Sequence, residues 1–274
     1  MTGDRNELPA VPRSGAANPA RVWNYWVGGT YHSAADREAA EAVLERLPHM
    51  MLLARETRRF LLGTVHQLAA AYGIRQFLDI GAGLPTADNT HDVAQRVASE
   101  SRIVYVDNDP VVTSHAGALL TGSTDGVTDY LDADLRDPAT IVAGAARALD
   151  FSQPVAILLV GVLHFITEAD DPYRIVACLV DAVPSGSYLA IVHGASDVQA
   201  EAVADSRRAY NEKSPVPYTP RSREQVARFF EGLDLLEPGV VPIGQRPSPG
   251  QPDAYAGNRL ADGSTSYCGV GRKP

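Results

Sequence analysis

The chain has 274 residues, of which 45% are hydrophobic and 21% charged, and its formal net charge is −9. These values are typical of a globular protein with a substantial core. The acidic balance disfavours nucleic acid as a partner, because phosphate contacts normally need a basic excess.

The sequence shows no sign of export or membrane insertion. The N-terminal residues lack the apolar core of a signal peptide, and the longest apolar run, residues 155–166, is too short to span a bilayer. Cys178 and Cys268 form no CxxC pair, which favours a reducing compartment. Cys178 lies in an apolar stretch and is expected to be buried. We therefore expect a cytoplasmic protein with no membrane partner.

The first 73 residues divide into two predicted parts. Residues 1–18 are polar and rich in Pro, Gly and Ala, which predicts disorder. Residues 19–73 predict an N-terminal helical cap or lid. Two apolar stripes at helical spacing support it, namely Ala40, Val43, Leu44 and Leu47, then Leu61, Val65, Leu68 and Tyr72.

From residue 74 to 274, short apolar runs alternate with helix-length segments. The runs lie at 77–80, 103–107, 127–132, 155–160 and 188–193. Continuous apolar strands are typical of a parallel sheet covered on both faces. Two further strands, near 233–241 and 265–273, have no helix between them and should pair antiparallel. We predict one α/β domain with a Rossmann-like, seven-stranded, mostly parallel sheet and an antiparallel last strand.

Three of the intervening helices are expected to begin at an Asp-Pro pair. The pairs lie at 109–110, 137–138 and 171–172. In each, the carboxylate can cap free amides while proline occupies the first helical position.

The sharpest local signal is FLDIGAGLP at residues 77–85. Asp79 ends an apolar strand, and Gly81-Ala-Gly83 forms a tight turn that lets the backbone approach a nucleotide-like ligand. A dinucleotide-binding pattern would have a third glycine at position 86, where this chain has Thr86.

Acidic residues also end the next two strands. Asp107 lies 24 residues beyond Gly83, at the spacing where such folds bind ribose hydroxyls. Asp134 follows the third strand, with a solvated turn as the alternative interpretation. Three acids around one pocket suit the sulfonium and ammonium groups of S-adenosylmethionine better than a pyrophosphate. Asp79 is placed to hold the ammonium.

These segments resemble the motifs of class I S-adenosylmethionine-dependent methyltransferases. The resemblance rests on FLDIGAGLPTADNTH, VYVDNDP and DADLRDP. With NPARVWNYWVGG at 18–29 and LLVGVLHFI at 158–166, it is closest to an actinobacterial family of proposed methyltransferases, once described as a domain of unknown function. It covers nearly the whole chain after residue 17.

The resemblance implies methyl transfer from S-adenosylmethionine to a small-molecule acceptor, with S-adenosylhomocysteine as the product. It places the amino-acid end of the cofactor at Asp79, Gly81 and Gly83, and the ribose at Asp107. It places the adenine at Asp134 and Leu135. Leu84, Asn108 and Tyr25 complete the candidate cofactor-binding set. Helix patterning resumes only near Thr90, so the sequence does not determine which amides of the loop 81–89 face the ligand.

Two other groups of residues are open to a functional or a structural interpretation. Asn24, Tyr25 and Trp26 indicate either a lid over cofactor and acceptor or an aromatic helix face packed on the core. His164 and His193 follow the fourth and fifth strands, where either could accept a proton from the acceptor. Both histidines could instead be structural hydrogen-bonded residues.

Three arginines lie close together in the second predicted helix. Arg55, Arg58 and Arg59 share a helix face, which favours a solvated or ion-paired surface over an anion site. No residue cluster predicts a metal site. Two alternative functions remain at this point: an NAD-dependent oxidoreductase, and a non-catalytic regulator that binds the cofactor on a methyltransferase scaffold.

Overall fold

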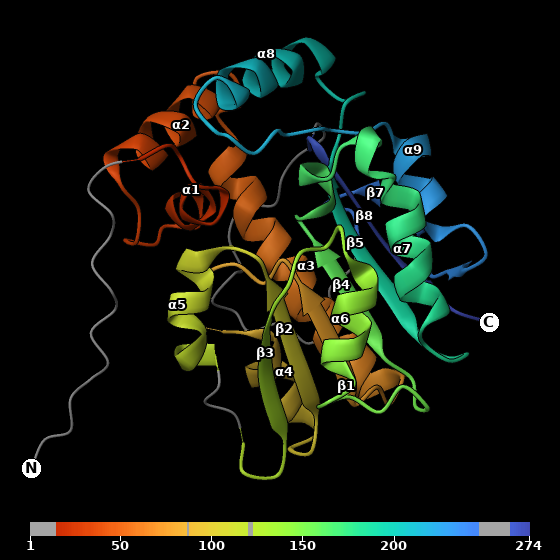
Figure 1. Ribbon diagram of the computed structural model, residues 1–274. Coiled ribbons are helices and arrows are strands. Elements are labelled where there is room, and N and C mark those ends of the chain that lie inside the picture. Colours follow the sequence, from red (N-terminus) through yellow and green to blue (C-terminus); the bar gives the residue numbers. More distant parts are fainter. Residues whose placement is uncertain (1–14, 87, 120–122, 247–263) are drawn as a thin grey trace, which may run out of the picture.

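The computed structural model describes residues 15–86, 88–119, 123–246 and 264–274, and within them a central sheet of eight strands (Figure 1). The strand order is β3-β2-β1-β4-β5-β8-β6, and β7 also pairs with β8. The strands are β1 (Gln76–Ile80), β2 (Arg102–Asp107), β3 (Val127–Asp132), β4 (Ala156–Val160), β5 (Tyr188–Gly194), β6 (Asp234–Leu235), β7 (Val241–Pro242) and β8 (Ser266–Arg272).

Strands β1 to β5 are parallel, whereas β8 runs antiparallel to β5 and also to β6 and β7. The predicted mostly parallel sheet with an antiparallel last strand is therefore confirmed. The sheet has eight strands instead of the predicted seven, because the strand expected at 233–241 is split by a turn. In that turn the Gly239 amide donates to the Leu236 carbonyl at 2.9 Å, and φ at Gly239 is +84°, which suits glycine. Two short strands, β6 and β7, result.

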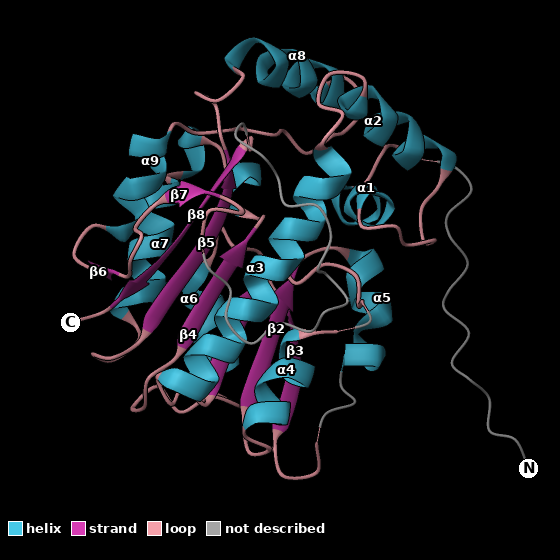
Figure 2. Ribbon diagram, turned by 180° about the vertical axis from the view of Figure 1, so that it is seen from behind, coloured by secondary structure: helices cyan, strands magenta, loops and turns pink. Residues whose placement is uncertain are grey.

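Helices cover both faces of the sheet (Figure 2). The helices α3 (Met50–Ala71) and α4 (Thr90–Val97) pack on one face through a shared apolar cluster. The helices α6 (Pro138–Ala145), α7 (Pro172–Asp181) and α9 (Arg223–Ala227) pack on the other face, and α5 (Pro110–Leu119) contacts β3. The short 3-10 turns are η1 (Leu163–Phe165), η2 (Glu168–Asp170) and η3 (Arg228–Phe230).

The three predicted Asp-Pro starts are confirmed. The Asp137 carboxylate accepts from the Thr140 amide at 3.1 Å, and the Asp171 carboxylate accepts from the Arg174 amide at 3.3 Å. Asp109 accepts from the Val111 amide at 2.8 Å. Local sequence therefore determines where α5, α6 and α7 begin.

Three helices lie across the carboxyl edge of the sheet and are called the cap: α1 (Pro19–Trp26), α2 (Ala34–Leu44) and α8 (Ala200–Asn211) (Figure 1). An apolar cluster that includes Val22, Ala40, Val43 and Val203 joins them. The Ala17 amide donates to the Lys213 carbonyl at 3.3 Å, so the chain before α1 lies along the end of α8. Of the segment expected to be disordered, residues 1–14 lie outside the described residues.

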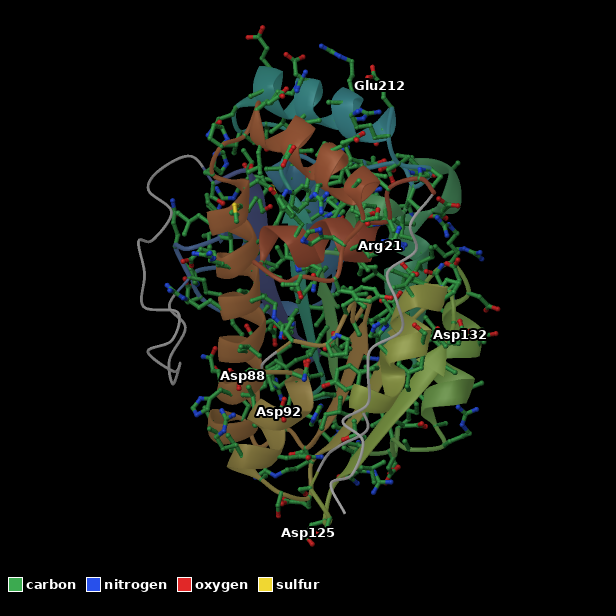
Figure 3. The ribbon with its side chains drawn as sticks, turned by 90° about the vertical axis from the view of Figure 1, so that its left-hand side faces the viewer. Arg21, Asp88, Asp92, Asp125, Asp132 and Glu212 are labelled. Carbon is green, nitrogen blue, oxygen red and sulfur yellow. The ribbon has the colours of Figure 1, made fainter. Side chains whose placement is uncertain are left out.

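A buried ion pair stabilises the cap from inside. The Arg21 Nε donates to Asp36 Oδ2 at 2.6 Å, and the two side chains are 7% and 0% exposed. Burial alone would raise the pKa of Asp36, but hydrogen bonds from Arg21, Ser33 and Asn18 keep it below its usual value. Figure 3 shows Arg21 within the cap and Glu212 at its outer end.

Two residues expected to be buried are exposed. Tyr72 is 43% exposed because it caps the end of α3, where its ring contacts the Tyr188 ring at a centroid distance of 5.2 Å. Cys178 lies on the solvent side of α7, whose buried face is formed by Ile175, Val176 and Leu179. No helix in the described part of the chain is long and apolar enough to cross a membrane.

Candidate functional site

A cavity of about 460 Å³ lies between the cap and the carboxyl edge of the sheet. This volume falls within the roughly 300–1,000 Å³ typical of small-molecule and cofactor sites. Loops that follow neighbouring parallel strands converge at this edge, which is why such sheets bind ligands there. Eight of the sequence-predicted site residues line the cavity: Asp79, Gly81, Gly83, Asp107, Asn108, Asp134, Leu135 and His164.

The glycine turn after β1 forms part of the cavity wall. Gly81 and Gly83 have φ values of +75° and +66°, a region that other residues adopt only with strain. A Cβ atom at Gly81 would lie 2.6 Å from the Val162 Cβ, so the turn packs closely against the loop after β4. The Gly83 amide donates to Asp107 Oδ2 at 2.9 Å, which joins the turn to the end of β2.

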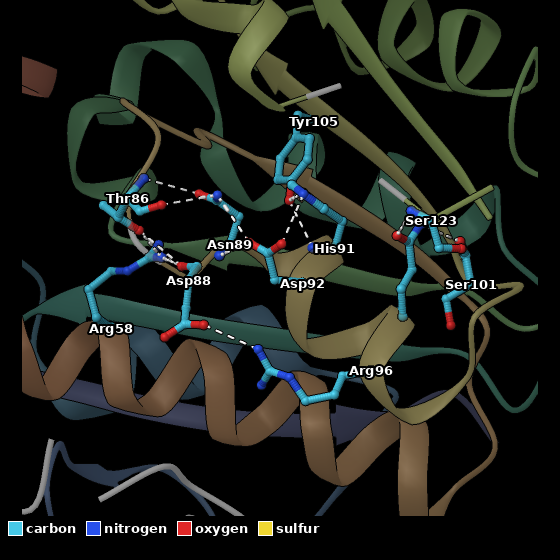
Figure 4. A network of polar contacts seen from close by, with 11 residues as sticks. Arg58, Thr86, Asp88, Asn89, His91, Asp92, Arg96, Ser101, Tyr105 and Ser123 are labelled. Atoms are coloured by element: carbon cyan, nitrogen blue, oxygen red, sulfur yellow. Dashed lines mark hydrogen bonds and ion pairs between the residues drawn. The ribbon is translucent and has the colours of Figure 1, made fainter. Parts of the chain in front are cut away.

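Polar contacts hold the chain between the glycine turn and α4 (Figure 4). The Thr86 amide donates to the Asn89 side chain at 3.1 Å, and Asn89 donates back to the Thr86 carbonyl at 3.1 Å. Arg58, which reaches in from α3, donates to Thr86 Oγ1 at 2.5 Å and also to the Asp88 carbonyl. Arg58 lines the cavity as well and so departs from the expected solvated or ion-paired surface. The other two arginines follow that expectation, since Arg55 is exposed and Arg59 pairs with Glu56 at 3.2 Å.

Asp79 is a buried carboxylate at the end of β1, only 5% exposed. Burial raises its pKa, while a hydrogen bond from Thr90 Oγ1 at 2.6 Å and the positive charge of Arg58 act in the opposite direction. The cavity therefore presents a negative and a positive side chain at the same end.

Asp107 ends β2 and faces the cavity. Burial raises its pKa to about 6, although amide donors from Gly83 and Asp109 favour the carboxylate and lower it. Oδ1 accepts from the Asp109 amide at 3.1 Å. A carboxyl group with this pKa is largely ionised at neutral pH and accepts hydrogen bonds strongly in this desolvated position.

The loop after β3 is joined to the loop after β2. Asn108 donates to Asp134 Oδ2 at 2.8 Å, and Arg136 binds the same oxygen at 2.9 Å. Leu135 is buried beside them and adds an apolar surface to the cavity wall.

His164 follows β4 and brings an imidazole to the cavity. Burial, and then the nearby His193 and Arg221, lower its pKa well below the usual value, so the ring is neutral. It is 9% exposed, and its Nδ1 is buried with no hydrogen-bond partner within the described ranges. Tyr218 packs against it edge to face at a centroid distance of 4.9 Å.

His193 packs edge to face against His164 at a centroid distance of 5.7 Å, but it is not among the residues that line the cavity. It is 0% exposed, and both ring nitrogens are engaged, one with the Gly194 carbonyl at 2.9 Å and one with Arg221 at 2.9 Å. Burial lowers the pKa of His193 to about 3. No free nitrogen is left to accept a proton from an acceptor, so its role in the structure is to bind Arg221.

Arg221 is a buried residue that sequence reasoning missed. It is 1% exposed, and it donates to the carbonyls of Leu163 and Ile166 at 3.1 and 2.9 Å. It also pairs with Glu168 at 2.8 Å. These contacts hold the loop that carries His164. No local pattern could have found Arg221, because the partners of its side chain lie 28 to 58 residues earlier in the chain.

Tyr25 and Leu84 are not among the residues that line the cavity. The Tyr25 hydroxyl donates to Glu41 at 3.3 Å, and its ring packs against His32. Tyr25 therefore faces α2 and the loop after α1, while Trp26, one residue on, is 8% exposed and lines the cavity. Within the same helix, Trp26 therefore fits the interpretation as a lid over the cavity, whereas Tyr25 fits the interpretation as a packed aromatic face.

The cavity has two chemically different halves. The acidic half is formed after β1, β2 and β3 and includes Asp79, Asp107, Asp109, Asp134, Arg136 and the nearby Arg58. The aromatic half is formed by the cap, the ends of β4 and β5 and the chain after α8. It includes Val22, Trp23, Trp26, Val43, His164, Phe165, Val203, Tyr210, Val216 and Tyr218. In the described part of the chain, every Asp, Glu, Lys and Arg that lines the cavity belongs to the acidic half.

Metal ligands are not grouped at this site. The described ranges contain no set of three or more His, Cys, Asp or Glu side chains positioned to hold a metal ion.

The sheet order, the glycine turn and the acids at the ends of neighbouring strands define the class of Rossmann-like methyltransferases. The model of the family described as S-adenosyl methyltransferase matches residues 9–274, and the chain belongs to this family. It is an S-adenosylmethionine-dependent methyltransferase, which sets aside the oxidoreductase alternative. No curated protein matches the chain.

Solved structures agree with this assignment. A DUF574 family protein from Streptomyces avermitilis is 38% identical, with a TM-score of 0.89 over 94% of this chain and 98% of that one. A proposed methyltransferase from Thermobifida fusca is 37% identical, with a TM-score of 0.83 over 94% and 95%. The plantazolicin methyltransferase shares the fold at 12% identity, with a TM-score of 0.54 over 93% and 95%.

Proposed function

We propose that the chain methylates a small-molecule acceptor bound beside S-adenosylmethionine in the cavity between cap and sheet. The observation that carries this proposal is that one cavity joins the acidic strand ends to His164 and the cap helices. Helices over the cavity favour a small acceptor and exclude water from the reacting groups. We place the reaction in the cytoplasm, because an exposed free thiol at Cys178 is compatible with a reducing compartment. The net charge of −9 disfavours nucleic acid as the acceptor.

The acidic half fits the amino-acid end of the cofactor. That end carries an ammonium and a carboxylate, and Asp79 and Arg58 offer the opposite charges at one side of the cavity. Gly81 and Gly83 have no side chain that would keep a ligand from the backbone.

The rest of the acidic half fits the adenosine. Asp107 is placed to accept hydrogen bonds from the ribose hydroxyls, and its neighbour Asn108 is held by Asp134. Asp134 and Leu135 would border the adenine with one polar and one apolar group. Tyr25 and Leu84 are left out of the proposed set because they do not line the cavity.

Bound S-adenosylmethionine supplies an electrophilic methyl group: the acceptor's lone pair forms the new bond, the C–S electron pair stays with sulfur, and the acceptor's proton is released. His164 is the side chain placed to receive that proton, because its neutral ring lines the cavity. Arg221 acts through His164 as a positioning residue. Most of the rate enhancement then comes from orientation and from exclusion of water.

Substitution of Asp107 tests the proposal. Calorimetric titration of Asp107→Asn with S-adenosylhomocysteine should show affinity about 100-fold weaker, because hydrogen bonds to a charged group are worth about 1.5–3 kcal/mol each. The matched control is Asp132→Asn, which removes an exposed acid at the end of β3 that does not line the cavity (Figure 3). Equal affinity for Asp107→Asn and the unaltered chain would contradict the assignment.

A further inference from the structure

We infer that the acceptor is a neutral, largely apolar molecule with an aromatic ring system, held in the aromatic half of the cavity. This inference rests on the proposed function and names the substrate class of the same site. It depends on the charge, the ring content and the position of that half.

The aromatic half offers no charge to an ionised acceptor. Its described lining residues include no Asp, Glu, Lys or Arg, and the His164 ring is neutral. The ions beside this half are already paired. Arg21 binds Asp36 at 2.6 Å, and Arg221 binds Glu168 at 2.8 Å. Arg136, which donates to the Phe165 carbonyl at 3.5 Å, binds Asp134 and Asp170. An ionised ligand would lose its hydration without gaining a partner, which costs several kcal/mol. The wall therefore selects a neutral acceptor.

Ring side chains supply most of the large groups in this half. Trp23 and Trp26 meet edge to face at a centroid distance of 6.1 Å, and both line the cavity. Phe165, Tyr210 and Tyr218 also line it. Aromatic side chains favour stacked and edge-to-face contacts with other rings, worth about 0.5–1.5 kcal/mol beyond their buried area.

Polar groups in this half are few, as expected of a site that orients an apolar ligand through one or two hydrogen bonds. They are the His164 ring and the hydroxyls of Tyr210, Tyr218 and Ser206, with Thr265 and Ser266 beside the end of β5. Tyr218 is packed against the end of β5, since a Cβ at Gly194 would lie 1.8 Å from its hydroxyl oxygen. The ring system of the acceptor would lie under the cap with its nucleophile toward His164.

The position of this half beside the acidic half suits transfer between the two. The loop after β4, which carries His164, packs against the glycine turn through Val162 and Gly81. Strands β1 and β4 are neighbours in the sheet, so the two halves meet at their carboxyl ends. A molecule in the aromatic half is therefore next to the proposed cofactor site.

Three probes with the same ring system and different charges test the inference. The full chain is titrated calorimetrically with S-adenosylhomocysteine, and then, at saturation, with 2-naphthol, 2-naphthoate and 2-naphthylmethylamine at pH 7. We expect 2-naphthol to bind at least tenfold more tightly than either charged probe, which corresponds to about 1.4 kcal/mol. Equal or tighter binding of a charged probe would overturn the inference.

The titration with S-adenosylhomocysteine distinguishes failure of the acceptor class from failure of the proposed function. Binding of S-adenosylhomocysteine without binding of any ring probe would overturn the acceptor class and leave the proposed function standing. Failure to bind S-adenosylhomocysteine would overturn both.

A charge introduced into the aromatic half should reverse the preference. Val216 lines the cavity and is partly exposed, so Val216→Lys places an ammonium there without burying it fully. The ratio of naphthoate to naphthol affinity should rise at least tenfold in this variant. The control is Val97→Lys, a partly buried position at the end of α4 that does not line the cavity. An unchanged ratio in Val216→Lys would place the probe elsewhere and overturn the inference.

Discussion

The acidic and aromatic halves of the cavity differ in how the fold produces them. The acidic half comes from loops that follow β1, β2 and β3, each a few residues from its strand. The aromatic half combines the ends of β4 and β5 with helices α1, α2 and α8, which are distant in sequence. Apart from Arg58 of α3, the first half is therefore local and fixed by the sheet, whereas the second depends on tertiary packing.

This difference has a consequence for specificity. Substitutions in the cap can alter the aromatic half without moving the carboxylates that end the strands. The binding of cofactor and acceptor should thus respond separately to mutation, unless the mutated residue joins both halves. Three changes test this separation, beginning with the largest expected effect.

Removal of Arg221 should damage the aromatic half most. Arg221→Met leaves the carbonyls of Leu163 and Ile166 and a nitrogen of His193 without their donor, so we expect the free energy of unfolding to fall by about 3 kcal/mol or more. Urea denaturation measures this change. Arg174→Met, at a side chain that is 79% exposed, should change stability by no more than about 0.5 kcal/mol.

The folded Arg221→Met chain should still bind S-adenosylhomocysteine like the unaltered protein, while its affinity for 2-naphthol drops. A parallel loss of both affinities would show that the two halves are not separable.

Acidification should act on the acidic half alone. The raised pKa of Asp107, about 6, means that below this pH the carboxyl is protonated and must lose a proton to accept hydrogen bonds as an anion. Affinity for S-adenosylhomocysteine should therefore fall about tenfold at pH 5 relative to pH 7. Asp79, whose pKa burial also raises, contributes with the same sign.

Calorimetry across pH 5–7 measures this dependence. Over that range the affinity for 2-naphthol at saturating S-adenosylhomocysteine should stay constant, because His164 has a strongly lowered pKa and His193 titrates near 3. A cofactor affinity that is flat down to pH 5 would argue against Asp107 and Asp79 as its ligands.

Asn18 joins the cap to the acidic half, and its loss should have the smallest effect. Its Oδ1 accepts from the Arg21 amide at 3.1 Å, and its Nδ2 donates to Asp109 at 2.5 Å. Asn18→Ala should cost about 1 kcal/mol of stability and release S-adenosylhomocysteine a few-fold faster. Ser222→Ala, which removes the N-cap of α9 away from the cavity, should cost similar stability with no change in release rate. Stopped-flow displacement distinguishes the two variants.

The parts of this fold with local causes could be predicted from sequence. Apolar runs gave the five parallel strands, and Asp-Pro pairs gave the starts of α5, α6 and α7. Asp79, Asp107 and Asp134 could be placed together because parallel strands end at one edge.

The parts that depend on contacts between distant segments of the chain could not be predicted from sequence. Nothing within residues 200–211 indicates that α8 would pack on α2, and the turn at Gly239 interrupts a segment that the apolar pattern predicts to be one strand. His164 follows β4 and His193 lies near the end of β5, but only the packing of Arg221 shows which of them faces the cavity.

The pairing of α2 with α8 also governs when the protein can finish folding. These helices begin 166 residues apart, at Ala34 and Ala200, and sequence-distant contacts form late. At synthesis rates of about 5–20 residues per second, α2 waits roughly 10–30 s for its partner. During that interval α2 can pack on α1, but Ala40 and Val43 lack the part of their packing surface that α8 supplies. Two of the three cap helices, α1 and α2, are thus among the first to be synthesised, while the cap is among the last parts to be assembled.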